Sequence, residues 1–175
     1  IIYWAKEYHI DGFRFDLMGL HDIETMQIIR KELDEIDPSI LMYGEGWTGG
    51  GTPLKSDQAA IKQNIIKFEK SQIAAFSDDT RDGVKGHVFN INERGYINGR
   101  EGLEDTIKFC IVGATGQLGI NYDRVIYSHW SWANEPYQCI NYISAHDNYT
   151  LWDKLTMSNR EDSIEKRKSM NNLAA

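Results

Sequence analysis

The chain has 175 residues, of which 41% are hydrophobic and 26% are charged, and its formal net charge at pH 7 is −7. These proportions are typical of a globular protein, and no stretch approaches the ~20 apolar residues of a membrane span, so no membrane partner is expected. The acidic balance argues against a nucleic-acid partner, because binding phosphates requires a basic surface. Cys110 and Cys139 lie far apart without a CxxC motif, which indicates neither a zinc site nor a disulfide framework.

The first part of the chain alternates helical and strand-like patterns. Residues 1–9 resemble the end of a helix, and residues 12–15 are strand-like. A helix follows, with Asp22 as its expected N-cap and Pro38 as its stop. Its apolar positions at helical spacing are Met26, Ile29, Leu33 and Ile36. The apolar run at residues 40–43 predicts a short buried strand.

The rest of the chain continues this alternation. Loops are expected at residues 48–53, 78–100 and 127–136, because these stretches carry Gly, Asn, Asp and Pro. The other predicted elements are a segment of mixed helical character at 58–67, a helix at 103–111, strands at 73–76 and 139–144, and the start of a helix at 167–175. Strands separated by helices predict a parallel α/β sheet, and no repeat or linker divides the chain.

Three segments place a carboxylate where a strand-like apolar run ends. They are DGFRFDLMG at residues 11–19 with Asp16, YGEGW at residues 43–47 with Glu45, and ISAHDN at residues 143–148 with Asp147. Barrel enzymes build their active sites from residues at strand ends. A set of carboxylates in this setting is suited to glycoside hydrolysis, which needs one protonated acid and one ionised carboxylate.

The neighbours of the first two carboxylates suggest how these roles divide. Alternation along a strand directs Arg14 and Asp16 to the same face, where the guanidinium favours the ionised form that a nucleophile requires. Glu45 stands between Gly44 and Gly46, which give a sugar close access and supply no cation, so Glu45 is expected to be the acid/base. The alternative is that Arg14 and Asp16 form a structural ion pair and that both glycines serve only as turn residues.

The three segments resemble the nucleophile, acid/base and stabiliser regions of the α-amylase superfamily of glycoside hydrolases. The sequences FRFDLMG, GEGW and SAHDN followed by TLWDKL resemble those of type I pullulanases, which are α-1,6 debranching enzymes. FSDDTRDGVKG at residues 76–86 and IKFCIVGAT at residues 107–115 also fit the pullulanase pattern. The resemblance covers nearly the whole chain.

The resemblance implies a role for each motif residue. Asp16 is expected to be the nucleophile, Glu45 the general acid/base and Asp147 the transition-state stabiliser, with Arg14 and His146 contacting the sugar. The substrate would be an α-glucan, hydrolysed with retention at its α-1,6 linkages. The chemistry needs no organic cofactor, and no metal ligand is assigned among these residues. An isoamylase-like enzyme or an amylopullulanase remains an alternative within the superfamily.

Three tryptophans are candidates for stacking on a glucose ring. Trp47 follows the acid/base motif, and Trp130 and Trp132 lie in the loop at residues 127–136. Packing within a loop is an equally simple role for Trp47 and the favoured one for the other two.

The resemblance also implies a (β/α)₈ TIM barrel, with the first motif on the fourth strand and the third motif on the seventh. A complete barrel needs about 250 residues, so we expect residues 1–175 to form one incomplete catalytic domain holding strands four to seven, without a second domain. The isolated chain is expected to be inactive.

Two other classes of protein are weighed against this one. GATGQLG at residues 113–119 is similar to a dinucleotide fingerprint, which functions only if a helix follows and holds the pyrophosphate at its N-terminus. A helix after Gly119 would favour this alternative. Residues 90–101 match parts of a calcium loop but carry too few anionic ligands. The non-catalytic alternative is a truncated carbohydrate-binding chain.

Overall fold

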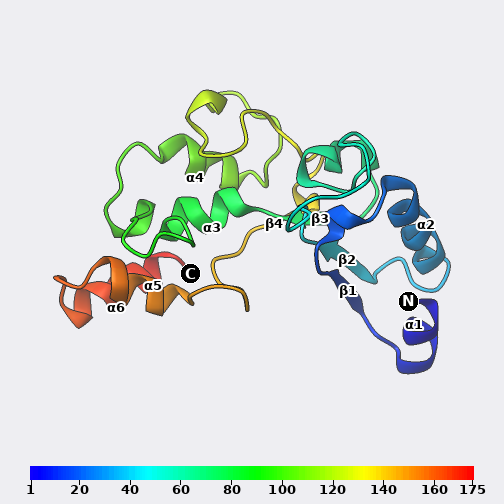
Figure 1. The fold of residues 1–175 in the computed structure, drawn as a ribbon, viewed down its shortest axis with the longest axis horizontal. Helices are drawn as coiled ribbons and strands as arrows, with labels where there is room; N and C mark the ends of the chain where they lie inside the picture. Colours follow the sequence, from blue (N-terminus) through cyan, green and yellow to red (C-terminus); the bar gives the residue numbers. More distant parts are fainter. The chain divides into compact units, whose positions relative to one another are not determined.

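The computed structural model describes all 175 residues, and its four strands form one parallel sheet (Figure 1). The strands are β1 (Gly12–Phe15), β2 (Leu41–Gly44), β3 (Ala74–Phe76) and β4 (Cys139–Ile140). They lie in the order β1-β2-β3-β4, and every neighbouring pair is parallel. The predicted parallel α/β sheet is therefore confirmed.

The chain divides into two compact units. Residues 1–76 and 131–140 form one unit, which contains all four strands and is called the sheet unit. Residues 77–130 and 141–175 form the other, which is called the helical unit.

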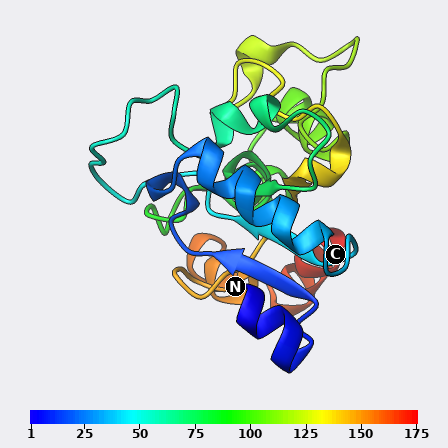
Figure 2. The same cartoon turned by 90° about the vertical axis from the view of Figure 1, so that its right-hand side faces the viewer.

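The sheet unit begins with two helices that flank β1 in sequence. The chain can be followed in Figure 2 from α1 (Ile2–Tyr8) through β1 into α2 (Ile23–Asp34). The predicted N-cap of α2 is confirmed, since Asp22 Oδ1 accepts a hydrogen bond of 2.7 Å from the backbone N–H of Thr25. This hydrogen bond lowers the pKa of Asp22. Met26 and Leu33 are fully buried on the helix face that the apolar spacing predicted.

The helical unit contains α3 (Asp78–Lys85), α4 (Glu104–Ile111), α5 (Leu151–Ser158) and α6 (Ile164–Leu173). The helices predicted near 103–111 and at the end of the chain are confirmed as α4 and α6. The expectation of loop throughout residues 78–100 was wrong, because its first eight residues form α3. Ser77 Oγ accepts the Thr80 N–H, and Asp78 and Asp79 place negative charge in the first turn, where it stabilises a helix.

The last strand is shorter than the predicted 139–144. It ends at Ile140, and the next side chain, Asn141, is engaged by helices of the helical unit. Its Oδ1 accepts from Thr80 Oγ1 at 2.6 Å, and its Nδ2 donates to the Cys110 carbonyl at 2.8 Å. These bonds hold the Asn141 side chain at the point where the strand ends.

The segment GATGQLG does not have the setting of a dinucleotide site. It follows the helix α4 instead of a strand. The next element after Gly119 is η4 (Tyr122–Arg124), a 3₁₀ turn of three residues. Without a helix N-terminus to hold a pyrophosphate, the dinucleotide alternative was wrong. Separately, no helix of this structure combines the length and apolar character needed to cross a membrane.

We expect Ser77→Ala to loosen α3, because the cap hydroxyl is lost from a fully buried position. Loss of such a cap costs about 1 kcal/mol, or roughly fivefold faster amide exchange through local opening. Hydrogen-exchange mass spectrometry of the protein encoded by the complete gene measures this. Ser163→Ala, which removes the corresponding cap of α6, should speed exchange in α6 and leave α3 unchanged. Unaltered exchange in α3 of Ser77→Ala would refute the capping role.

Candidate active site

Two of the predicted carboxylates stand at the ends of neighbouring strands. Asp16 directly follows the last residue of β1, and Glu45 directly follows the last residue of β2. The strands are parallel, with Phe15 opposite Gly44, so the two acidic residues leave the sheet at the same level. Adjacent carboxyl ends of parallel strands are where α/β enzymes gather their reactive groups.

Arg14 joins these two carboxylates. Its Nη1 donates to Asp16 Oδ1 at 2.5 Å, and its Nη2 donates to Glu45 Oε1 at 2.8 Å. The guanidinium carbon also lies 5.7 Å from the centre of the Phe76 ring at the end of β3. The predicted placement of Arg14 and Asp16 on one face of the strand is confirmed by their ion pair. Three consecutive strands therefore contribute to one cluster around Arg14.

The two carboxylates differ in exposure and in their hydrogen bonds. The Glu45 side chain is buried, with 5% of its surface exposed, whereas 66% of the Asp16 side chain is exposed. The second carboxylate oxygen of Glu45 accepts a 2.8 Å hydrogen bond from the backbone N–H of Leu17. Leu17 has a left-handed backbone, with φ of 45°, which is disfavoured for a residue with a side chain. Such strain is often found where a backbone is held in place for function.

The expectation that no cation accompanies Glu45 was wrong. Its sequence neighbours are glycines, but Arg14 reaches it from the adjacent strand. Both carboxylates therefore share one positive charge. The difference between them lies in burial and in the Leu17 hydrogen bond, and the presence of a cation does not distinguish them.

The glycines around Glu45 are required by close packing of the chain on itself. A Cβ atom at Gly44 would lie 2.7 Å from the Phe15 carbonyl oxygen, and one at Gly46 would lie 2.6 Å from the Lys62 backbone nitrogen. The space beside these glycines is filled by protein, so the expectation that they open a path for sugar was wrong. Their effect is to fix the backbone that carries Glu45.

The tryptophans have different environments. Trp47 is partly exposed, and its backbone N–H donates to the Glu45 carbonyl at 2.8 Å, which closes a tight turn after the motif. Trp132 is 1% exposed, so a stacking role at the surface is excluded for it. Trp130 is 55% exposed. Trp47 stays a candidate sugar contact.

The third predicted carboxylate belongs to the helical unit. Asp147 Oδ1 lies 3.1 Å from His146 Nε2, and the two side chains are 53% and 64% exposed. They occupy a turn whose base is closed by a 2.9 Å hydrogen bond from the Leu151 N–H to Ser144 Oγ. The structure thus brings the predicted residues together in two groups, with Arg14, Asp16 and Glu45 in the sheet unit and His146 and Asp147 in the helical unit.

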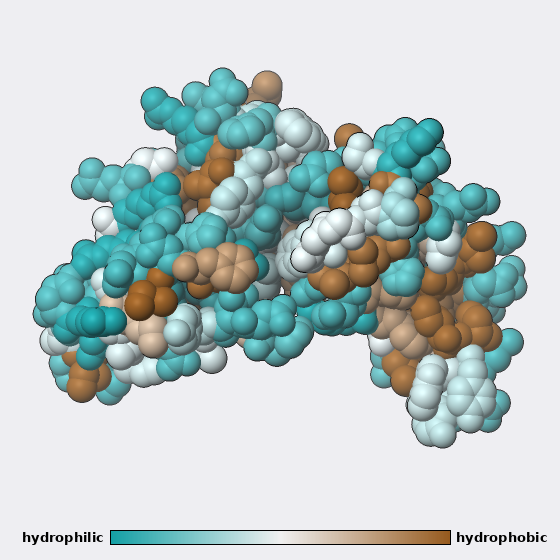
Figure 3. Space-filling view, viewed as in Figure 1, coloured by the Kyte–Doolittle hydropathy of each residue, from teal (hydrophilic) through white to brown (hydrophobic).

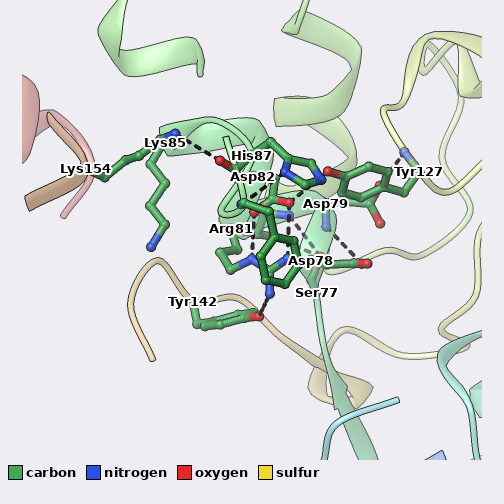
Figure 4. A network of polar contacts seen from close by, with 12 residues as sticks. Ser77, Asp78, Asp79, Arg81, Asp82, Lys85, His87, Tyr127, Tyr142 and Lys154 are labelled. Atoms are coloured by element: carbon green, nitrogen blue, oxygen red, sulfur yellow. Dashed lines mark hydrogen bonds and ion pairs between the residues drawn. The ribbon is translucent and has the colours of Figure 1, made fainter. Parts of the chain in front are cut away.

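A buried polar network around α3 was not predicted (Figure 4). Asp79 is fully buried and accepts hydrogen bonds from Ser128 Oγ at 2.6 Å, from the Ser128 N–H at 3.0 Å and from the Tyr127 N–H at 3.1 Å. Asp82 accepts two bonds from the neighbouring Arg81, at 2.7 and 3.1 Å, and one of 2.8 Å from the Tyr127 hydroxyl. The sequence signal was the charged run DDTRD, which is placed in the interior despite its polarity.

Burial and charge together set the pKa values in this network. Burial opposes the charge of Arg81, but the hydrogen bond and negative charge of Asp82 outweigh it and raise the pKa of the guanidinium. The Nη1 of Arg81, which does not bind Asp82, donates to the Tyr142 hydroxyl at 2.9 Å. Burial raises the pKa of Tyr142 to about 12, against the opposing effect of Arg81. Burial, reinforced by Asp82, also raises the pKa of Tyr127.

Comparison with known proteins identifies the relatives of this chain. A pullulanase of Bacillus subtilis is 34% identical over 175 residues, which is 100% of this chain and 23% of that protein. The chain is a homologue of pullulanases. A crystal structure of the Paenibacillus barengoltzii pullulanase, in complex with maltohexaose and α-cyclodextrin, is 46% identical and superimposes with a TM-score of 0.86 over 99% of this chain and 25% of that one.

A second solved structure agrees with the first. The type I pullulanase from Bacillus subtilis, complexed with maltose, superimposes with a TM-score of 0.88 at 34% identity, over 99% of this chain and 23% of that one. No family model matches the sequence. The resemblance to type I pullulanases is confirmed, and the chain spans about a quarter of the length of these relatives.

The structure contains no group of three or more His, Cys, Asp or Glu side chains arranged to hold a metal ion. The cluster of Arg14, Asp16 and Glu45 combines two carboxylates with an arginine bonded to both. The arrangement places two carboxylates of different exposure on one shared cation.

We expect Gly46→Ala to destabilise the backbone that carries Glu45, because the added Cβ would lie 2.6 Å from the Lys62 nitrogen. Overpacking of this kind lowers the free energy of unfolding by about 1–3 kcal/mol. Gly50→Ala is the matched control, since nothing lies within 4 Å of a Cβ there. Urea titration of the two variants measures the difference, and equal unfolding midpoints would show that the packing at Gly46 is not restrictive.

Proposed function

We propose that this chain carries the catalytic carboxylates of a retaining glycoside hydrolase that cleaves α-1,6-glucosidic linkages in pullulan, glycogen or branched starch. The observation that carries the proposal is the homology to pullulanases over the whole chain, together with the bridging of Asp16 and Glu45 by Arg14. The oligosaccharides bound to the solved relatives support an α-glucan substrate.

The fold assignment behind this function is a (β/α)₈ barrel, of which β1 to β4 would be strands four to seven. Four parallel strands in sequential order support it, as do carboxylates directly after β1 and β2. Side chains of β2, β3 and β4 line a hollow of about 530 Å³ on the sheet, as expected of a face that further strands would cover. We further propose that both units belong to one incomplete catalytic domain, residues 1–175, without a second domain.

Asp16 has the geometry of the proposed nucleophile. Arg14 holds Oδ1, and Oδ2 makes no hydrogen bond within the chain, which leaves it available to attack the anomeric carbon. In a retaining reaction this attack forms a glycosyl-enzyme ester as the glycosidic bond to the leaving oxygen breaks. Because Asp16 and Glu45 bind one guanidinium, their carboxyl groups are near each other, and the retaining mechanism requires a separation of about 5–5.5 Å.

Glu45 is the proposed general acid/base. Both of its oxygens accept hydrogen bonds, from Arg14 and from the Leu17 N–H, which is the pattern of an ionised carboxylate. Such a carboxylate matches the second half of the reaction, in which it takes a proton from the water that hydrolyses the ester. To protonate the leaving oxygen in the first half, Glu45 must carry a proton, which can sit on a lone pair of either oxygen that these two hydrogen bonds do not use.

The remaining predicted residues would complete the sugar subsite. We propose that Asp147 stabilises the positive charge that develops on the sugar, and that His146 and Arg14 contact its hydroxyl groups. The high exposure of His146 and Asp147 leaves both accessible to a ligand. Trp47, which is partly exposed beside Glu45, would offer an aromatic face to a glucose ring.

The function is tested with pullulan and with an activated aryl glycoside, using the protein encoded by the complete gene. Asp16→Ala should abolish turnover of both and prevent formation of the covalent intermediate. Glu45→Gln should slow pullulan by about 10²–10⁴-fold and the aryl glycoside much less, because a good leaving group departs without an acid. Glu7→Gln, at an exposed position of α1, is the control.

Two outcomes would contradict these roles. Equal loss on both substrates in Glu45→Gln argues against the acid role, and turnover retained in Asp16→Ala removes the nucleophile. Binding of maltooligosaccharides without any turnover by the unmodified protein would favour the non-catalytic alternative. Preference for branched amylopectin over pullulan would indicate an isoamylase-like enzyme, and cleavage of amylose an amylopullulanase.

We also expect the 175-residue chain by itself to be inactive on pullulan. β1 and β4 are each paired on one side only, and Leu41 is 62% exposed. Figure 3 shows apolar surface, coloured brown, gathered over the sheet unit. An open edge and exposed apolar surface favour aggregation, and a displacement of ~1 Å at the cluster can cost about 10²-fold in rate.

Hydrolysis of pullulan by the purified chain is measured beside the protein from the complete gene, with size-exclusion chromatography as a check for aggregation. Comparable rates would overturn the proposal that further strands are needed to complete the site.

A further inference from the structure

The segment that carries Asp147 has little regular structure of its own. It runs from Asn141, directly after β4, to the start of α5 at Leu151, and it contains turns but no helix or strand. Backbone groups outside a helix or sheet must find other partners or face water. The position of Asp147 therefore depends on what anchors this segment from outside.

The helix α3 contacts the segment through three side chains. Thr80 Oγ1 donates to Asn141 Oδ1 at 2.6 Å, Arg81 Nη1 donates to the Tyr142 hydroxyl at 2.9 Å, and Lys85 Nζ donates to the Tyr149 carbonyl at 2.9 Å. Figure 4 shows the contact of Arg81 with Tyr142. Positions 81 and 85 lie one helical turn apart on the same face. One face of α3 thus anchors both ends of the segment.

Lys85 is an unusual anchor. It is 1% exposed, and the Tyr149 carbonyl is its one hydrogen-bond acceptor, although an ammonium has three donors. The pKa of Lys85 is lowered to about 8. Burial is the main cause, the positive charges of Arg81 and Lys154 add to it, and the negative charge of Asp82 opposes it. A buried charge with so few partners is costly.

The Tyr149 carbonyl lies in the same turn as Asp147, so fixing this carbonyl restricts the position of Asp147. It lies two residues beyond Asp147 and directly before Thr150, whose hydroxyl caps α5 by accepting the Asp153 N–H at 3.3 Å. Ser144 closes the same turn by accepting the Leu151 N–H. The bonds of Ser144 and Thr150 lie within residues 144–153, whereas the bond of Lys85 comes from α3. The Lys85 bond therefore fixes this turn relative to α3.

We propose that Lys85 is a positioning residue that holds Asp147 in its reactive place by anchoring the Tyr149 carbonyl. The inference rests on the proposed function, in which Asp147 stabilises the transition state. Lys85 does not touch the sugar in this role. It acts on the rate only through the geometry of Asp147.

Lys154 provides a matched control. It is fully buried like Lys85, and burial lowers its pKa too. Its Nζ donates to the His87 carbonyl at 2.9 Å and to the Asn90 carbonyl, which both belong to the loop after α3. Removing either lysine deletes a buried ammonium, but only Lys85 is bonded to the segment that carries Asp147.

The experiment measures pullulan hydrolysis by Lys85→Met and Lys154→Met in the protein from the complete gene. Lys85→Met should lower kcat roughly 10- to 100-fold, because a displacement of about 1 Å has an effect of this size. KM should change less than about twofold, and Lys154→Met should leave kcat within about twofold of the unmodified protein.

A double-mutant cycle with Asp147→Asn separates positioning from general damage. If Lys85 acts through Asp147, Lys85→Met should lower kcat by less than about twofold more when Asp147→Asn is already present. If the loss of kcat in the double variant equals the product of the losses in the two single variants, the inference is overturned. Equal kcat in Lys85→Met and Lys154→Met would also overturn it. If Lys85→Met does not fold, Lys85→Leu, which also removes the N–H donor to the Tyr149 carbonyl, is put through the same cycle with the same criterion.

Failure of the proposed function can be distinguished from failure of the Lys85 inference. In the first case the unmodified protein does not hydrolyse pullulan, or Asp147→Asn leaves kcat unchanged. A protein that hydrolyses pullulan and depends on Asp147, but is indifferent to Lys85, refutes this inference alone.

Discussion

The bridge from Arg14 to both Asp16 and Glu45 is the interaction on which the site depends. Glu45 is buried, and a buried carboxylate is strongly unfavourable without a compensating charge. The compensation requires β1 and β2 to pair in one register, with Arg14 opposite Tyr43. A slip of one residue would turn Arg14 to the opposite face of the sheet, so the electrostatic need of Glu45 and the packing of the strands specify the same pairing.

The backbone around Glu45 is held from several sides. Gly44 and Gly46 allow neighbouring chain to approach to distances at which a Cβ would clash, and Leu17 adopts a left-handed conformation while its N–H binds the Glu45 carboxylate. Each feature restricts movement, and the left-handed residue costs energy. In the role proposed for Glu45 such restriction is an advantage, because the reaction rate depends steeply on distance.

The sequence predicted the elements whose signals are local. Strand-like runs, the Asp22 cap and the periodic apolar residues of α2 all lie within a few positions of one another, and the structure confirms them. What could not be predicted depends on contacts distant in sequence. The cation beside Glu45 comes from 31 positions away, and the lysines of the helical unit are buried although lysine is usually exposed. The helix α3 was missed because its aspartates suggested a loop, whereas Ser77 and the first-turn acids are start signals.

Different interactions hold the acidic residues of the two units in position. In the sheet unit, Asp16 and Glu45 are placed by strand ends, whose hydrogen-bonded ladder is rigid by itself. In the helical unit, the chain that begins at Asn141, after β4 has ended, has no ladder, and side chains of α3 donate hydrogen bonds to it instead. Buried polar groups are a costly way to order a segment, and apolar packing would often be more stable. Hydrogen bonds have the advantage of direction: they define where a particular carbonyl lies, as Lys85 does for Tyr149. In the role proposed for Asp147, that precision would fix where its carboxylate meets the sugar.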